Sequence, residues 1–267
     1  MSSKFHSKQQ SSSSGSRRQP RLLHPGLQVN SERLSGSQSV VHFVREVATG
    51  KDMICKIIKN SDLKSFQSEH KALKAIMDTG LWEHGFPRIL STMQDEEQFE
   101  LLIEAQGKNL RLVMDEMKCG NFTKSTIMKI GIQVLDLLEL LHDCHFVHGD
   151  LKFENLVFGQ RDKNKIYLID FGLATKILTD AGLHEERVNT KTFSGNFLFA
   201  SMNSCRGYSK SRRDDVESLI YMISYYISNK YLPWCDLTRY HGVNDLKSLL
   251  QERLEISNIK RLFSLVP

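Results

Sequence analysis

The first part of the chain alternates short β-rich stretches with turns. These stretches contain β-branched and aromatic residues and are bounded by polar or glycine-containing turns, which predicts strands. The predicted strands are residues 40–46, 53–58, 86–90 and 99–104. A helix is predicted at residues 61–77, where Phe66, Leu73 and Ile76 supply its apolar positions.

The clearest helical pattern lies further along, at residues 124–142. Apolar residues recur there at intervals of three and four positions, which places them on one face of a helix. They are Ile127, Ile130, Val134, Leu137 and Leu141. Thr123 or Ser125 can cap the helix. Residues 216–227 are apolar nearly all round, which predicts a second, buried helix.

Composition separates a polar tail from the rest of the chain. The 267 residues are 40% hydrophobic, enough to bury a core in one domain or two lobes. Residues 1–26 are rich in Ser and Gln, and we expect them to form a disordered basic tail. Five basic residues in this tail, with no acid, equal the whole net charge of +5. The neutral remainder therefore gives no reason to expect nucleic-acid binding by the folded part.

Cysteine usage and hydropathy bear on the compartment. The five cysteines are scattered and form no Cys-x-x-Cys pair, which favours a reducing compartment. No signal peptide and no stretch long enough to span a bilayer is evident. We expect a cytoplasmic or nuclear location. His142, Cys144, His145 and His148 could be mistaken for a zinc site, but their spacing fits no common zinc pattern.

The strongest chemical signal lies in residues 148–172. Asp150 can accept a proton from a hydroxyl group, and Lys152 can neutralise charge on a transferred phosphoryl group. Asn155 and Asp170 offer the oxygen ligands that Mg²⁺ prefers. The segment between Asn155 and Asp170 is predicted to form a hairpin of two short strands, residues 156–158 and 166–169. This hairpin would return Asp170 close to Asn155. Together they predict chemistry on a metal-bound phosphate.

Several of these stretches carry a resemblance to a known family. Residues 148–155, His-Gly-Asp-Leu-Lys-Phe-Glu-Asn, and residues 170–172, Asp-Phe-Gly, resemble the catalytic loop and metal-binding motif of protein kinases. Residues 211–219, Ser-Arg-Arg-Asp-Asp-Val-Glu-Ser-Leu, are very close to the Ser-Arg-Arg-Asp-Asp-Leu-Glu-Ser-Leu of the casein kinase 1 group, which includes the vaccinia-related kinases. Gly-Lys-Asn-Leu at residues 107–110 and Leu-Pro-Trp at residues 232–234 are also similar to that group.

The resemblance implies an α+β, two-lobed protein-kinase fold from about Leu27 onward. Residues 27–104 would form a small β-rich N-lobe, and residues 105–267 the hinge and a larger helical C-lobe whose last helices are missing. The implied activity is a Ser/Thr protein kinase that uses ATP and Mg²⁺ to phosphorylate hydroxyl groups of protein substrates. We expect it to be a monomer.

The family's functional positions fall on identifiable residues of this sequence. Asp150 and Lys152 would be catalytic, and Asn155 and Asp170 would hold the metal. The ATP-binding positions would be Gly36, Val41, Lys56, Glu69, Glu104, Gln106 and Val157. Among them Lys56 would pair with Glu69 and hold phosphates, and the backbone at residues 104–106 would meet the adenine edge, beside the gatekeeper Ile103. The supporting positions would be His148 and Asp215, the latter bonded to the catalytic-loop backbone.

The degenerate nucleotide loop, Ile54 and the missing last helices favour an alternative to the enzyme, whereas two further substitutions concern regulation and substrate choice. Gly36 is the only glycine left of three in the nucleotide loop, and Ile54 replaces the small alanine above the adenine. Gly149 replaces an arginine that many kinases use to bind an activation-loop phosphate, so that charge partner is expected to be absent. Leu198 replaces an arginine that recognises phosphate or acid on the substrate. The alternative is a pseudokinase, a nucleotide-binding or scaffolding module without turnover.

Overall fold

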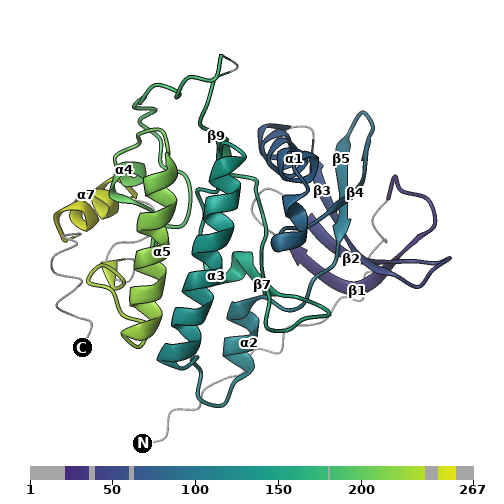
Figure 1. The fold of residues 1–267 in the computed structure, drawn as a ribbon, viewed down its shortest axis with the longest axis horizontal. Helices are drawn as coiled ribbons and strands as arrows, with labels where there is room; N and C mark the ends of the chain where they lie inside the picture. Colours follow the sequence, from purple (N-terminus) through teal and green to yellow (C-terminus); the bar gives the residue numbers. More distant parts are fainter. Residues whose placement is uncertain (1–21, 36–39, 60–62, 180, 238–245, 257–267) are drawn as a thin grey trace, which may run out of the picture.

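Five antiparallel strands from the first half of the chain form one sheet, in the order β1-β2-β3-β5-β4 (Figure 1). The computed structural model describes residues 22–35, 40–59, 63–179, 181–237 and 246–256. The strands are β1 (Leu27–Ser35), β2 (Val40–Glu46), β3 (Asp52–Lys59), β4 (Ile89–Gln94) and β5 (Gln98–Glu104). Helix α1 (Leu63–Asp78) lies against this sheet.

The predicted strand at residues 86–90 is wrong in its position. Strand β4 begins only at Ile89, and Phe86 instead packs into the core with 1% of its surface exposed. Pro87 has no amide hydrogen to give to a neighbouring strand. The apolar character of this stretch therefore reflects core packing and not strand pairing.

The α-helices that follow the sheet in the chain lie to its left in Figure 1. The α-helices are α2 (Leu110–Glu116), α3 (Lys124–Asp143), α4 (Met202–Cys205), α5 (Arg212–Ile227) and α7 (Leu246–Ile256). Two short 3₁₀ turns are η2 (Leu81–His84) and η3 (Phe153–Asn155). The predicted apolar face of α3 is confirmed, because all five of its residues are at most 4% exposed. Thr123 caps this helix by accepting a hydrogen bond from the amide of Thr126.

Two small antiparallel pairs connect the sheet to the helices. Strand β7 (Leu156–Phe158) pairs with β8 (Ile166–Leu168), which confirms the predicted hairpin. Strand β6 (Phe146–Val147) pairs with β9 (Thr175–Lys176). These pairs bring the segments before and after the Asp-Phe-Gly sequence back to the loop that contains Asp150.

One buried cluster runs from α1 into the helical half. It joins Leu73 and Ile76 of α1 to Phe86, then to Phe171, and on to residues of α3 and α5. Because this core is continuous, the sheet and the helices hold each other at a fixed spacing around the polar residues between them. Among the described residues, no helix is both long and apolar enough to cross a membrane.

A second, smaller cluster covers the outer face of the sheet, where Glu100 holds the segment before β1. Glu100 is fully buried, and its carboxylate accepts hydrogen bonds from the amides of Leu23 and His24 and from Nδ1 of His24. Gln98 donates to the same carboxylate. Four donors thus satisfy this buried carboxylate. Residues 23 and 24 were assigned to the tail from sequence, but they are hydrogen-bonded to β5.

Candidate active site

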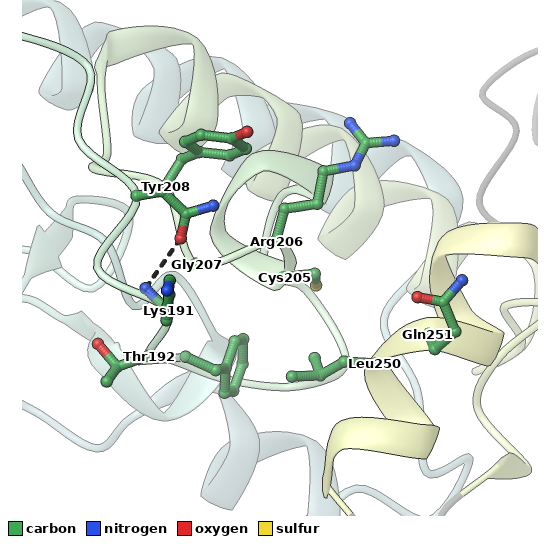
Figure 2. Close-up of a pocket in the computed structure, with 10 residues that line it drawn as sticks. Lys191, Thr192, Cys205, Arg206, Gly207, Tyr208, Leu250 and Gln251 are labelled. Carbon is green, nitrogen blue, oxygen red and sulfur yellow. Dashed lines mark hydrogen bonds between the residues drawn. The ribbon is translucent and has the colours of Figure 1, made fainter.

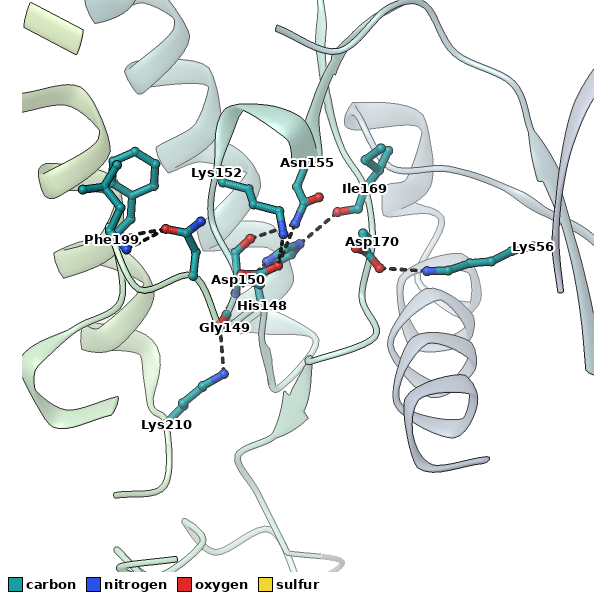
Figure 3. A network of polar contacts seen from close by, with 12 residues as sticks. Lys56, His148, Gly149, Asp150, Lys152, Asn155, Ile169, Asp170, Phe199 and Lys210 are labelled. Carbon is teal, nitrogen blue, oxygen red and sulfur yellow. Dashed lines mark hydrogen bonds and ion pairs between the residues drawn. The ribbon is translucent and has the colours of Figure 1, made fainter. Parts of the chain in front are cut away.

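Lys56 lies at the centre of a buried group of charges between β3 and the helical half. Its Nζ is 2.6 Å from Oε2 of Glu69 on α1 and 2.8 Å from Oδ1 of Asp170 (Figure 3 shows the Asp170 contact). The Lys56 side chain is 9% exposed and that of Glu69 is 2% exposed, whereas that of Asp170 is 42% exposed. The predicted pairing of Lys56 with Glu69 is therefore present, with Asp170 as an additional partner.

The ionisation of this group follows from its burial and its mutual contacts. Burial opposes the charge on Lys56, but the two carboxylates outweigh it and raise the pKa of Lys56. Burial would raise the pKa of Asp170, yet the ammonium of Lys56 outweighs burial and lowers that pKa to about 2. Burial is the largest effect at Glu69 and raises its pKa, against the attraction of Lys56. Asp170 is therefore ionised at neutral pH, as a metal ligand must be.

Asp150, Lys152 and Asn155 form a second cluster on the loop that follows β6. Nζ of Lys152 lies 2.5 Å from Oδ2 of Asp150, which is 8% exposed. Nδ2 of Asn155 donates to the backbone oxygen of Asp150 at 2.8 Å and to its Oδ2 at 3.2 Å. Figure 3 shows these three side chains converging, with Asp170 on the side toward Lys56. Both bonds use the amide nitrogen of Asn155, which leaves its amide oxygen for a cation.

Asp215, at the start of α5, holds the backbone of this loop. Its two carboxylate oxygens accept hydrogen bonds from the amides of His148 and Gly149, both at 2.8 Å. His142 also lies beside it, with Nε2 3.0 Å from Oδ2. Asp215 is 1% exposed, so three donors compensate a buried charge. The contact from Asp215 to the loop was predicted from sequence, whereas the part of His142 was not.

The Asp-Phe-Gly segment is held by the ring of Phe171 and by contacts from His148 in the catalytic loop. Phe171 is fully buried, and its ring packs edge-on against that of His148 at a centroid distance of 5.1 Å. His148 Nε2 donates to the backbone oxygen of Ile169 at 3.1 Å. Asp170 itself has a φ of +66°, a left-handed conformation that Asp tolerates better than most residues. The amide of Ile169 donates to the backbone oxygen of Asn155, so the two predicted metal ligands are adjacent.

The remaining predicted nucleotide-binding residues lie on β2, on β7 and at the hinge after β5. Val41 faces Lys56 across the β2–β3 pair, and Val157 on β7 is buried. Glu104 ends β5, and the oxygen of the Gln106 side chain accepts a bond from the amide of Gln160. Gly36, with the rest of the predicted nucleotide loop, lies outside the described residues.

The hinge after β5 leads directly into α2, which sequence patterns did not predict. Asn109 caps this short helix by accepting a hydrogen bond from the amide of Leu112. Gly107 donates to the backbone oxygen of Phe158, and a Cβ on Gly107 would lie 2.7 Å from that oxygen. A side chain at position 107 would therefore push the hinge away from β7. The sequence signal that could have predicted this helix is Asn109, a favourable N-cap residue, followed directly by apolar residues.

The histidine and cysteine residues that resemble a zinc site are used separately. His142 contacts Asp215, and His148 contacts Ile169. Within the part of the chain that the structure describes, the close group of potential metal ligands is instead His24, Cys55 and Glu100, whose carboxylate already holds residues 22–24.

A separate hollow of about 640 Å³ opens between the segment after Asp170 and helix α7 (Figure 2). It is lined by Asn189, Lys191, Thr192, Phe193, Cys205, Arg206, Gly207, Tyr208, Leu250 and Gln251. None of these residues belongs to the Lys56 or Asp150 clusters. The chemistry predicted from sequence thus lies elsewhere, between the sheet and the loop after β6.

The comparison with known families agrees with this site. Residues 32–261 match the family described as protein kinase domain. Because the match covers more than half of the sequence, the chain belongs to the protein kinase family. The predicted two-lobed fold, with its β-rich and helical parts, is thereby confirmed.

Within that family the similar proteins include vaccinia-related kinases and casein kinase I homologues. The B1 kinase of vaccinia virus (strain Western Reserve) is 30% identical over 213 residues, which are 75% of this chain and 68% of that protein. Human serine/threonine-protein kinase VRK2 is 34% identical over 135 residues, 50% of this chain and 26% of its own length. The fowlpox virus probable serine/threonine-protein kinase FPV212 is 36% identical over 57% of this chain and 48% of its own length. The chain thus spans half or less of VRK2 and FPV212.

A solved structure of vaccinia related kinase 3 supports the fold alone. It superposes with a TM-score of 0.67 and 20% sequence identity, covering 87% of this chain and 73% of that one.

Proposed function

We propose that this chain is an active Ser/Thr protein kinase that transfers the γ-phosphoryl group of ATP to hydroxyl groups of proteins. The observation that carries the proposal is a pair of neighbouring polar clusters, Lys56 with Asp170 and Asp150 with Asn155. Each of these residues has the chemical type that phosphoryl transfer uses. The relatives named above as serine/threonine kinases support the same substrate class.

The donor set fits a magnesium ion. Asp170 supplies an ionised carboxylate, and Asn155 supplies an amide oxygen from the neighbouring backbone. Hard oxygen donors of this kind suit Mg²⁺ better than a softer metal. When bound, the ion would neutralise negative charge on the phosphates of ATP.

The protein's own residues then have distinct tasks in the reaction. Lys56, fixed by Glu69, would hold the phosphates, and Asp150 would orient the substrate hydroxyl and accept its proton. Lys152, 2.5 Å from Asp150, would lie beside the transferred group and stabilise its charge. The N–H groups of His148 and Gly149 bonded to Asp215 keep Asp150 in place during these steps.

A transfer assay with radiolabelled ATP and a generic acidic protein tests this proposal. Asp150→Asn should reduce the rate by about 10²- to 10⁴-fold, the contribution typical of a general base. Asp136→Asn is the matched control, because Asp136 is an exposed carboxylate on α3, and its activity should be unchanged. Wild-type protein that transfers no phosphate, or an Asp150→Asn variant as active as the control, would reject the enzyme.

The alternative, a nucleotide-binding scaffold without turnover, is favoured by one specific residue. Ile54 on β3 is only partly buried and faces Ile103 and Phe43 on the neighbouring strands. Its extra bulk would crowd the adenine. Nucleotide binding measured by calorimetry, in a protein with no transfer activity, would support this alternative.

A further inference from the structure

The backbone oxygen of Gly149 accepts a long-range hydrogen bond that no local sequence pattern predicts. Nζ of Lys210 donates to this oxygen at 2.9 Å, although the two residues are 61 positions apart (Figure 3). A Cβ built on Gly149 would lie 2.7 Å from that Nζ and 2.8 Å from Cδ of the same lysine. Lys210 thus fills the space beside Gly149 that a side chain at position 149 would enter.

Both backbone groups of Gly149 are held by one short segment. Its N–H donates to Asp215, and its oxygen accepts from Lys210, which lies two residues before α5. Ser211 between them is fixed by a capping box with Asp214. Because these contacts fix the peptide that precedes Asp150, they fix the direction of the catalytic carboxylate as well. Gly149 has a φ of +76°, a conformation that glycine adopts at little cost.

The same oxygen is also where the segment after Asp-Phe-Gly approaches the loop. A Cβ on Gly195 would lie 2.9 Å from the Gly149 oxygen and 3.8 Å from Nζ of Lys210. The ammonium is therefore placed at a junction of three parts: the catalytic loop, the segment around Gly195 and the start of α5. Burial lowers the pKa of Lys210, while the carboxylates of Asp215, Asp150 and Asp214 oppose that effect. The three carboxylates thus offset part of the cost of burying this ammonium.

We propose that Lys210 is a positioning residue for phosphoryl transfer, which supplies from the start of α5 the cation that position 149 lacks. Many kinases place an arginine before the catalytic aspartate and need an activation-loop phosphate to fix it. Here the lysine is bonded to the loop itself, so the loop is held without that phosphate. This role rests on the proposed kinase activity, since it concerns the placing of Asp150.

Two substitutions separate the charge of Lys210 from its shape. Lys210→Met keeps the length of the side chain but removes the cation, and Lys210→Arg keeps the cation. If the charge places the loop, Lys210→Met should lower kcat by about tenfold or more with KM for ATP within about twofold, and Lys210→Arg should retain more activity than Lys210→Met. A residue that only fills space would give the opposite order, because methionine matches the shape of lysine better. Lys163→Met, at an exposed lysine in the β7–β8 turn, is the control.

Hydrogen exchange of the amides at residues 149–152 gives a readout that does not need turnover. Lys210→Met should raise the exchange rates of this loop and leave those of α3 unchanged. Loss of kcat together with faster exchange supports the proposal. A Lys210→Met variant with wild-type kcat, or with unchanged exchange, overturns it, as does a Lys210→Arg variant less active than Lys210→Met. If the wild type shows no transfer at all, the proposed function fails, and the positioning role for catalysis falls with it. Exchange then decides only whether Lys210 holds the loop.

Discussion

Replacing Lys56 by methionine tests the energetics of the buried charge group directly. Methionine keeps most of the length of the side chain and its apolar stem but removes the ammonium. Glu69 and Asp170 would then face each other without the cation that lies 2.6 and 2.8 Å from them. The effect on stability should therefore come from two uncompensated carboxylates, and little of it from a cavity.

The size of the effect can be estimated from burial. Removing one partner of a buried ion pair typically costs about 3–5 kcal/mol, because the other charge stays buried. Glu69, at 2% exposure, should bear most of that cost. Asp170 is 42% exposed, so water screens its share, for which we allow less than about 1 kcal/mol. We expect Lys56→Met to lower the free energy of unfolding by about 3–4 kcal/mol at neutral pH.

The loss should depend on pH with a definite sign. The pKa of Glu69 is already raised by burial, and loss of Lys56 raises it further. A carboxyl group whose pKa is higher in the folded state destabilises that state as the pH rises above the unfolded value of about 4.3. The deficit of the variant should therefore shrink on acidification, by up to about 1.4 kcal/mol per pH unit while Glu69 takes up its proton. In the wild type Asp170 behaves oppositely, since Lys56 lowers its pKa and the resulting stability is lost only as the pH falls below about 4 toward 2.

Urea unfolding of wild type and variant between about pH 5 and pH 8 measures this difference, in a range where Asp170 of the wild type stays ionised. The deficit near pH 8 should exceed that near pH 5, because the raised pKa of Glu69 lets it take up its proton on acidification. Lys129→Met, which changes an exposed lysine on α3, should show no deficit at any pH. A deficit that is the same at all pH values, or below about 1 kcal/mol, would mean that Glu69 is not an ionised partner of Lys56.

Three further outcomes follow from the substituted positions. Ile54→Ala should lower KM for ATP about 10- to 100-fold and change kcat less, because overpacking above the adenine costs about 1–3 kcal/mol; an unchanged KM in steady-state kinetics would contradict the crowding argument. Leu198 has no charge to recognise a phosphate, so kcat/KM on a primed peptide should be close to that on an unprimed one, and an advantage of about a hundredfold would refute this. Phosphatase treatment should leave activity within about twofold, because Lys210 already holds the catalytic loop; a loss of about tenfold would show that a phosphate is needed.

Local pattern predicted the elements that place the site, for reasons that the structure makes visible. The face of α3 could be read because each of its apolar residues is needed in the core. The β7–β8 hairpin could be read from two apolar runs and a polar turn, and it brings Asp170 to Asn155 as expected. The pairing of Lys56 with Glu69 was accessible because a lysine among apolar strand residues requires a nearby anion.

Other contacts could not be predicted because they depend on long-range geometry. Nothing in the polar run around Lys210 indicates that its ammonium reaches a carbonyl 61 residues away. The hydrogen bonds from the amides of Leu23 and His24 to Glu100 could not be predicted either, because every residue except proline carries an amide that could donate. At Phe86 and Pro87 a strand was predicted that does not form. A short apolar run is compatible both with a strand and with a core segment outside any strand.

The conformation of Asp170 bears on the choice between an enzyme and a scaffold. Its left-handed backbone, with φ at +66°, costs free energy that a purely structural turn would avoid by using glycine. The chain retains an aspartate there, buries Phe171 completely beside it, and directs the carboxylate at Lys56. A scaffold that bound nucleotide without turnover would still need Lys56, but it would not need Asp150 bonded to Lys152 and Asn155 on the opposite side. Strain kept at one charged residue and a second polar cluster beside it both support the proposed turnover.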